Sequence, residues 1–274
     1  MKTTTDIASN FSGGLRPIWV ASYPRSGNTF LLILLENFFG LPAYSIYNLA
    51  GSPKPDPSAR HTEASPLLPT DWRKFITKDS NISPALVKTH DLPEDDSPAI
   101  YIVRDGRPAI NSYFHFNQTF EPTSALTLTE TIAGGGFGSW SAHYRGWQPQ
   151  QRPRTLFLRY EDLVLRPEAV IPRLAEFLQR EPMGGRVPTF AELRAKDPKF
   201  FRRGQNQDFL NEWSPTQISL FNTLHGEVMT ELGYPLTDAP LPDKNQLATL
   251  TGDTSRRLTF WRKLRRAAGL VTVL

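Results

Sequence analysis

A chain of 274 residues has room for one large domain or two small ones, and its composition (39% hydrophobic, 11% aromatic, 21% charged) excludes a disordered or fibrous protein. The sequence has no cysteine, which excludes disulfides, thiolate nucleophiles and zinc–thiolate sites. The net charge is +4, but six of the 31 basic residues follow Asp253, the last acidic residue, so residues 1–253 hold 25 basic and 27 acidic side chains, a net charge of −2. A slightly acidic body predicts no nucleic-acid partner.

The amino-terminal residues lack the apolar stretch of a signal peptide. No apolar run in the sequence reaches the ~18 residues that a membrane span requires. We therefore expect a soluble, cytoplasmic protein.

Short apolar runs alternate with helical patterns along the chain. The runs predict strands at residues 17–22, 85–89, 99–103 and 155–159, and the patterns predict helices at residues 28–39, 107–116, 139–147, 167–179 and 215–232. The proline-rich residues 41–70 lack periodicity and are expected to run over the surface. Alternating strands and helices predict one α/β domain with a central parallel sheet flanked by helices. It spans residues 1–253, with its core at about residues 17–235.

The segment Tyr23-Pro-Arg-Ser-Gly-Asn-Thr-Phe30 joins the first strand to the first helix. The free N–H groups and the dipole of a helix N-terminus attract phosphate. In this turn Gly27 allows close backbone approach, Ser26 and Thr29 offer hydroxyl donors, and Arg25 supplies a positive charge. The Walker A spacing is absent, and a simple helix cap is the alternative interpretation.

This octapeptide resembles the loop of sulfotransferases that use 3′-phosphoadenosine-5′-phosphosulfate (PAPS), which is written YPKSGTTW in that family. The differences are Arg25 for lysine, Asn28 for threonine and Phe30 for tryptophan. The resemblance extends over residues 17–235, because the family's other motifs follow in order. It implies a P-loop-like turn, here residues 25–30, that binds PAPS and its product PAP without a metal, with Phe30 stacked on the base.

Residues 84–90, PALVKTH, resemble the family's strand that ends in KTH. The resemblance implies that His90 is the general base, a role that suits a neutral imidazole near pH 7. Lys88 lies two residues earlier on the same strand face, where it can balance charge on the leaving-group oxygen. Arg25 is expected to assist Lys88. The alternative for His90 is a capping or core histidine.

Residues 101–112 carry the second signature, in which Arg104 ends a strand and Ser112 follows eight residues later on a helix. In the family this pair binds the 3′-phosphate. The alternative is a salt bridge of Arg104 with Asp105 and a surface role for Ser112.

Three further segments complete the predicted cofactor site. Phe200-Phe-Arg-Arg-Gly204 resembles the family's late loop FMRKG, so Arg202, Arg203 and the Gly204 amide are expected at the 3′-phosphate. Tyr160, in a YED turn, would meet the adenine, and Phe190 resembles the aromatic residue of the family's TSF segment.

These motifs predict transfer of a sulfuryl group from PAPS to a hydroxyl or amine of a small-molecule or lipid acceptor. The alternatives are a P-loop nucleotide kinase or hydrolase and a non-catalytic nucleotide-binding protein of the same fold. A kinase or hydrolase needs magnesium ligands and a Walker lysine, which the motifs do not supply. The residues specify neither the acceptor nor an oligomeric state.

The tail, residues 254–274, has apolar side chains on one side of a helical projection and basic side chains on the other. This pattern favours peripheral contact with an anionic membrane. A helix docked on its own domain and a solvated end are the alternatives.

Overall fold

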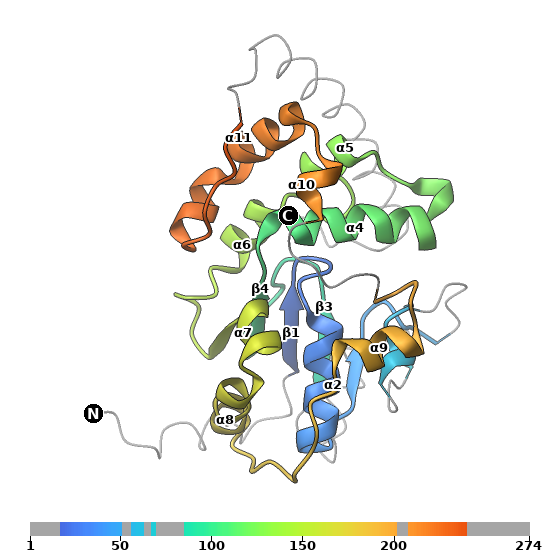
Figure 1. Ribbon diagram of the computed structural model, residues 1–274. Helices are drawn as coiled ribbons and strands as arrows, with labels where there is room; N and C mark the ends of the chain where they lie inside the picture. The colour runs from blue at the N-terminus through green and yellow to red at the C-terminus, as the bar shows by residue number, and fades with distance from the viewer. Residues whose placement is uncertain (1–16, 51–55, 63–66, 70–84, 202–207, 240–274) are drawn as a thin grey trace.

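The computed structural model describes residues 17–50, 56–62, 67–69, 85–201 and 208–239. Within them, a five-stranded parallel sheet forms the centre of the domain, with the strand order β2-β3-β1-β4-β5 (Figure 1). The strands are β1 (Ile18–Ser22), β2 (Ala43–Ser45), β3 (Leu86–Thr89), β4 (Ala99–Val103) and β5 (Thr155–Arg159). The predicted parallel α/β fold is confirmed.

The middle strand β1 is buried along its whole length because helices cover both faces of the sheet. Its Ile18 and Val20 pack into a cluster with α2 (Asn28–Phe39), α7 (Tyr160–Leu165) and α8 (Pro167–Leu178). Its Trp19 and Ala21 pack into a second cluster with α4 (Gly106–Phe120), α6 (Trp140–Trp147) and α11 (Pro215–Glu231). In Figure 1, α4 and α11 lie across the upper part of the domain, and α2 and α8 lie in its lower half.

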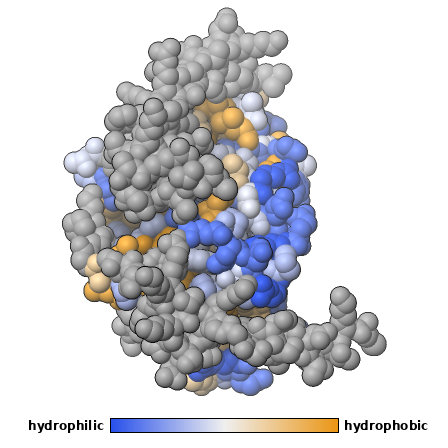
Figure 2. Space-filling view, turned by 180° about the vertical axis from the view of Figure 1, so that it is seen from behind, coloured by the Kyte–Doolittle hydropathy of each residue, from blue (hydrophilic) through white to orange (hydrophobic). Residues whose placement is uncertain are grey.

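Short elements complete the described chain: α5 (Leu128–Ile132), α9 (Phe190–Lys196), α10 (Phe209–Glu212) and the 3₁₀ turns η2 (Ala59–His61) and η3 (Pro122–Ser124). On the face shown in Figure 2, the described residues at the right of the view are mainly hydrophilic, consistent with apolar side chains gathered in the two clusters.

The expectation that residues 41–70 run over the surface is wrong for the first residues of this segment. Residues 43–45 form the edge strand β2, which pairs with β3 and is buried throughout. Tyr44 is part of the core cluster, so this three-residue strand is stabilised by packing rather than by any periodic pattern.

Candidate functional site

The turn between β1 and α2 has the backbone of an anion-binding loop. Gly27, with φ of 102°, is the N-cap of α2, and Arg25 has φ of 63°. A left-handed arginine is uncommon and costs about 1–3 kcal/mol, so the surrounding structure must enforce this conformation. The buried Ser26 hydroxyl has no hydrogen-bond partner among the described residues. The turn thus combines a helix N-terminus with a buried, unsatisfied polar group.

The Arg25 side chain is held between two other segments of the predicted site. Its Nε donates to Ser112 Oγ at 3.2 Å, and its terminal NH2 group donates to the Phe200 carbonyl at 2.7 Å. The guanidinium carbon lies 4.2 Å from the centre of the Phe200 ring. Two predicted residues, Arg25 and Ser112, are therefore brought together, and the segment just before residue 202 meets them.

Arg104 and Tyr160 pack on the same turn from the other side. Arg104 donates to the Arg25 carbonyl at 3.0 Å, and its guanidinium carbon lies 4.2 Å from the centre of the Tyr160 ring. A Cβ atom at Gly27 would lie 2.5 Å from Tyr160 Cδ2, so glycine is needed for this approach as well as for the positive φ. The predicted residues Arg104 and Tyr160 both lie against the turn.

Lys88 lies in β3, directly beside β1, and pairs in register with Val20. Its Nζ donates to Asp56 Oδ2 at 2.7 Å and to Ser58 Oγ at 2.5 Å. Burial alone raises the pKa of Asp56, but the Lys88 charge and hydrogen bonds from Lys88, Ser45 and Ser58 hold that pKa below its usual range. Lys88 and Asp56 therefore form a buried ion pair, and the sequence did not predict the carboxylate.

His90 follows β3 and faces the end of β1. Its Nδ1 lies 2.8 Å from the Ser22 carbonyl oxygen, and its backbone N–H donates to the Tyr47 hydroxyl at 2.7 Å. The imidazole stacks on the Tyr47 ring, with centroids 5.6 Å apart and planes 13° apart, and meets the edge of Phe137 at 5.5 Å. Burial and then the Lys88 charge lower the pKa of His90 to about 3, so the ring is neutral near pH 7.

The remaining predicted residues of the turn occupy the start of α2. The Asn28 amide donates to the Val20 carbonyl at 2.9 Å and to Ser22 Oγ at 3.3 Å, which ties α2 to β1. Thr29 is buried, and Phe30 is partly buried against the cluster beneath α2. In this structure the Asn28 amide therefore supports the backbone of the turn, and the roles of Thr29 and Phe30 at a ligand stay predictions.

The late motifs are described only in part. Phe190 is the first residue of α9 and is 36% exposed. Arg202, Arg203 and Gly204 lie outside the described residues. The same holds for the tail, residues 254–274.

Sequence reasoning missed Asp56, Ser58 and Phe137, all of which contact Lys88 or His90. One signal indicated that Lys88 has an acidic partner: a lysine in an apolar strand requires a counter-ion, because an unpaired buried charge is costly. No comparable signal marked the Phe137 ring.

A second buried histidine lies behind the site. His143 Nδ1 is 2.9 Å from the Tyr101 hydroxyl, and burial lowers the pKa of His143 to about 3. Both side chains are buried: Tyr101 is 1% exposed and His143 is 2% exposed.

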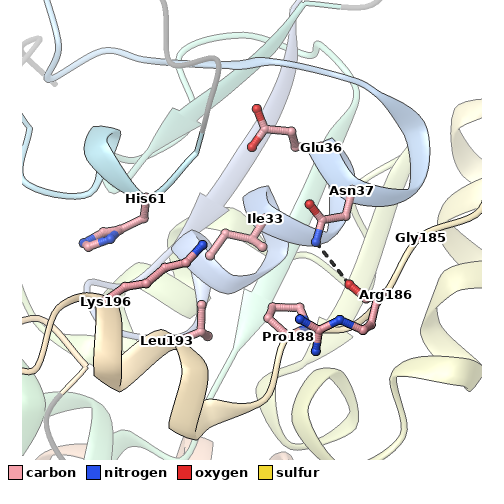
Figure 3. Close-up of a pocket in the computed structure, with 9 residues that line it drawn as sticks. All are labelled: Ile33, Glu36, Asn37, His61, Gly185, Arg186, Pro188, Leu193 and Lys196. Atoms are coloured by element: carbon pink, nitrogen blue, oxygen red, sulfur yellow. Dashed lines mark hydrogen bonds between the residues drawn. The ribbon is translucent and has the colours of Figure 1, made fainter.

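A cavity of about 370 Å³ lies beside α2 (Figure 3). In Figure 3 the Asn37 amide donates to the Arg186 carbonyl across one side of it, at 3.1 Å. Its lining is Ile33, Glu36, Asn37, His61, Gly185, Arg186, Pro188, Leu193 and Lys196. Arg25, Lys88 and His90 do not line it, so the cavity alone does not mark the chemical site.

Among the described residues, no group of three or more histidine, cysteine, aspartate or glutamate side chains is placed to hold a metal ion. In the same residues, no helix has the length and apolar character needed to cross a bilayer.

The strand–turn–helix unit and its parallel sheet define an α/β domain of the kind that presents a helix N-terminus to a phosphorylated ligand. Residues 15–233 match the family model of the sulfotransferase domain. The chain therefore belongs to the sulfotransferase domain family, and its class is that of a transferase enzyme.

Similar proteins cover much of the chain. Cytosolic sulfotransferase 1 of Danio rerio is 25% identical over 80% of this chain and 85% of its own length. Sulfotransferase 1 family member D1 of Rattus norvegicus is 28% identical over 60% of this chain, and the match spans 59% of the rat protein.

Among solved structures, mouse sulfotransferase SULT7A1 complexed with PAP superimposes with a TM-score of 0.60 at 20% identity, covering 84% of this chain and 90% of that one. Retinol dehydratase in complex with retinol and PAP has a TM-score of 0.54 at 17% identity, covering 87% of each chain. These two neighbours share the fold.

Proposed function

We propose that this protein transfers a sulfuryl group from PAPS to a hydroxyl or amine of a small-molecule acceptor. One observation carries the proposal: three adjacent strands, β1, β3 and β4, place four predicted residues at or near their carboxyl ends, namely Arg25, Lys88, His90 and Arg104. Three cations and one neutral imidazole around a helix N-terminus suit a phosphosulfate donor and an acceptor that must lose a proton.

The residues around the turn fit the donor substrate. The product PAP carries about −3 to −4 of charge on two phosphomonoesters. Arg25 and Arg104 bring permanent positive charge to the turn, and Ser112 lies within hydrogen-bond distance of Arg25. The unsatisfied Ser26 hydroxyl is the type of group that a ligand oxygen satisfies. We assign these residues and the turn amides to the donor phosphates.

The donor supplies an activated sulfuryl group on a phosphate leaving group. In the transfer, the acceptor oxygen bonds to sulfur while the bond from sulfur to the phosphate oxygen breaks and its electron pair leaves with the phosphate. His90 Nε2 takes the acceptor proton, because Nδ1–H is already donated to the Ser22 carbonyl. Lys88 and Arg25 stabilise the charge that develops on the leaving phosphate.

The acceptor is expected next to His90, against Tyr47 and Phe137. Both rings contact the imidazole, and they contact each other at a centroid distance of 5.6 Å. Aromatic walls beside a polar reacting group suit a mainly apolar small molecule. Retinol dehydratase, a structural neighbour, was solved with retinol and with androsterone, which supports the small-molecule class.

Two measurements test the proposal. Calorimetric titration should show tight PAP binding without magnesium and no comparable binding of ATP with magnesium. Labelled PAPS should then pass its sulfate to a member of a panel of phenols, alcohols, sugars, amines and lipids. Preferred binding of magnesium–ATP would support a kinase or hydrolase instead. PAP binding with no transfer to any acceptor would support a non-catalytic nucleotide-binding protein.

A further inference from the structure

The proline-rich segment that follows β2 supplies a buried counter-ion to Lys88. The side chains of Lys88 and Asp56 are 5% and 7% exposed, and Nζ and Oδ2 are 2.7 Å apart. These residues are 32 positions apart in the sequence. A buried lysine with no carboxylate would be strongly disfavoured, so the position of Asp56 determines where the ammonium can lie.

Asp56 is itself fixed by three groups other than Lys88. Its Oδ2 accepts from Ser45 Oγ at 2.7 Å, and its Oδ1 accepts from the Ser58 backbone N–H at 2.9 Å and from Ser58 Oγ at 2.7 Å. Ser45 belongs to β2, the strand paired with β3. The carboxylate is therefore held rigidly relative to the strand that carries Lys88.

Two of the three N–H donors of the Lys88 ammonium group are used, and this fixes the orientation of the group. A lysine ammonium has three N–H donors, and those of Lys88 bond to Asp56 at 2.7 Å and Ser58 at 2.5 Å. Two bonds of fixed direction orient the tetrahedral group, which leaves the third N–H pointing in one defined direction. Lys88 lies on β3 two residues before His90, and its Nζ lies 5.8 Å from the centre of the Tyr47 ring that stacks on His90, so the ammonium group lies near the proposed base.

The same segment reaches the other reacting groups. Tyr47 stacks on His90, and the His61 ring contacts the Phe200 ring at a tilt of 46°, with centroids 4.3 Å apart. The Arg25 guanidinium in turn lies over the Phe200 ring and donates to the Phe200 carbonyl. The described residues of this segment therefore support Lys88 through Asp56 and Ser58, His90 through Tyr47, and Arg25 through His61 and one intervening side chain, Phe200.

We propose that Asp56 is a positioning residue for the transfer: it orients the Lys88 ammonium so that its third N–H meets the leaving phosphate oxygen. This inference rests on the proposed function. Asp56 acts only through Lys88 and contacts neither the donor nor the acceptor. Because the Lys88 contact strengthens as charge develops on the leaving oxygen, loss of the orientation should lower kcat far more than it weakens ground-state binding of the donor.

The test compares Asp56→Asn with a matched variant, Asp95→Asn. Asp95 also accepts from the backbone N–H two residues later, Ser97 at 2.8 Å, and from a side chain, Trp19 Nε1 at 3.0 Å, but it lies in the loop before β4. We expect Asp56→Asn to lower kcat for labelled sulfate transfer by about 10- to 100-fold, the scale of a small misplacement of a reacting group, with the affinity for the donor PAPS, titrated without an acceptor, within about three-fold of wild type. Asp95→Asn should leave both values within two-fold.

A second variant covers the case in which Asp56→Asn does not fold. Ser58→Ala keeps the carboxylate and removes one Lys88 bond, so we expect a kcat loss of about three- to ten-fold with unchanged PAPS affinity. If the wild-type protein transfers the label, wild-type kcat in Asp56→Asn, or in Ser58→Ala where Asp56→Asn does not fold, overturns this inference alone. Loss of PAPS affinity in step with kcat also overturns it, because the role is then in ground-state binding. A wild-type protein that transfers no label overturns the proposed function, and the inference with it.

Discussion

His90 Nδ1 lies 2.8 Å from the Ser22 carbonyl oxygen, which fixes both the tautomer and the direction of the imidazole. A carbonyl oxygen can only accept, so Nδ1 carries the proton and Nε2 keeps its lone pair. β1 thus holds the proposed base beside the turn that follows the same strand.

The first prediction concerns this base. His90→Gln should lower kcat for sulfate transfer by about 10²- to 10⁴-fold, the usual contribution of a general base, while calorimetry shows PAP affinity close to wild type. His115→Gln is the control, because His115 lies on α4 and pairs with Glu212 of α10. A His90→Gln protein with wild-type kcat would remove His90 from the mechanism.

The second prediction is the pH dependence of transfer. The base acts in its neutral form, and burial together with the Lys88 charge lowers the pKa of His90 to about 3. As pH falls from 8 to 5, His90 therefore stays neutral, and kcat should show no loss assignable to its protonation. Rates measured across this range with a folded-state check at each pH provide the test. A one-proton loss of kcat with a midpoint near 6.5 that disappears in His90→Gln would contradict the low pKa.

The third prediction concerns the glycine of the turn. Gly27 and Gly138 have φ values of 102° and 92°, but only Gly27 has a neighbour, Tyr160, within clashing distance of an added Cβ. Gly138→Ala should cost about 1–2 kcal/mol of unfolding free energy from strain alone. Gly27→Ala should cost a further ~1–3 kcal/mol from overpacking against Tyr160.

Urea unfolding of the two glycine variants measures the difference, and PAP titration gives a second readout. Gly27→Ala should also bind PAP more weakly, because Tyr160 and the turn must shift, whereas Gly138→Ala should bind normally. Equal unfolding free energies for the two variants would mean that Tyr160 does not pack on the turn as described.

The fourth prediction is that Arg25→Lys, which restores the residue usual in the resembled motif, weakens the site. Arg25 donates through two nitrogens, to Ser112 and to Phe200, and stacks on the Phe200 ring. A lysine ammonium cannot reproduce this planar arrangement. We expect PAP affinity to fall about 10-fold, which corresponds to 1.4 kcal/mol. Arg145→Lys, at a surface ion pair with Glu231, should leave the affinity unchanged. Unaltered affinity in Arg25→Lys would show that charge alone matters at this position.

The sequence predicted the strands with continuous apolar runs and the longer helices, and it missed the short helices and the edge strand. Continuous apolar runs predicted β1, β3, β4 and β5, and helical patterns of eight or more residues predicted α2, α4, α6, α8 and α11. The missed elements, β2, α5, α7, α9 and α10, have three to seven residues, too few to show a period. Tertiary packing determines them, as the burial of Tyr44 in β2 illustrates.

The same distinction applies to the site. Arg25, Lys88, His90 and Arg104 were predicted because the motifs that contain them resemble those of the sulfotransferase family, and each lies in or next to a recognisable strand. Asp56 could not be selected, because a buried lysine requires a carboxylate but the sequence offers 27 acidic residues. Only the pairing of β2 with β3 shows which one lies beside Lys88.

The last prediction is acid destabilisation through buried histidines. His225 is 1% exposed; its Nε2 lies 2.9 Å from the Ile132 carbonyl, and burial lowers the pKa of His225 to about 4. His143 is similarly buried, with a pKa of about 3. Below pH ~6.5 the unfolded chain protonates both rings while the folded protein does not, so the unfolded state binds more protons and stability falls as pH falls. Each ring should remove up to about 1.4 kcal/mol per pH unit between pH 6.5 and its folded pKa.

Urea unfolding at pH 7, 6 and 5 tests this slope. His225→Gln keeps an amide donor for the Ile132 carbonyl but cannot titrate, so its stability should depend on pH less steeply, by up to about 1.4 kcal/mol per pH unit. Met229→Leu, a buried change in the same helix, should shift the unfolding free energy equally at every pH. If His225→Gln follows the wild-type slope, the acid sensitivity arises from groups other than His225, and its ring must be protonated in the folded protein at the same pH as in the unfolded chain.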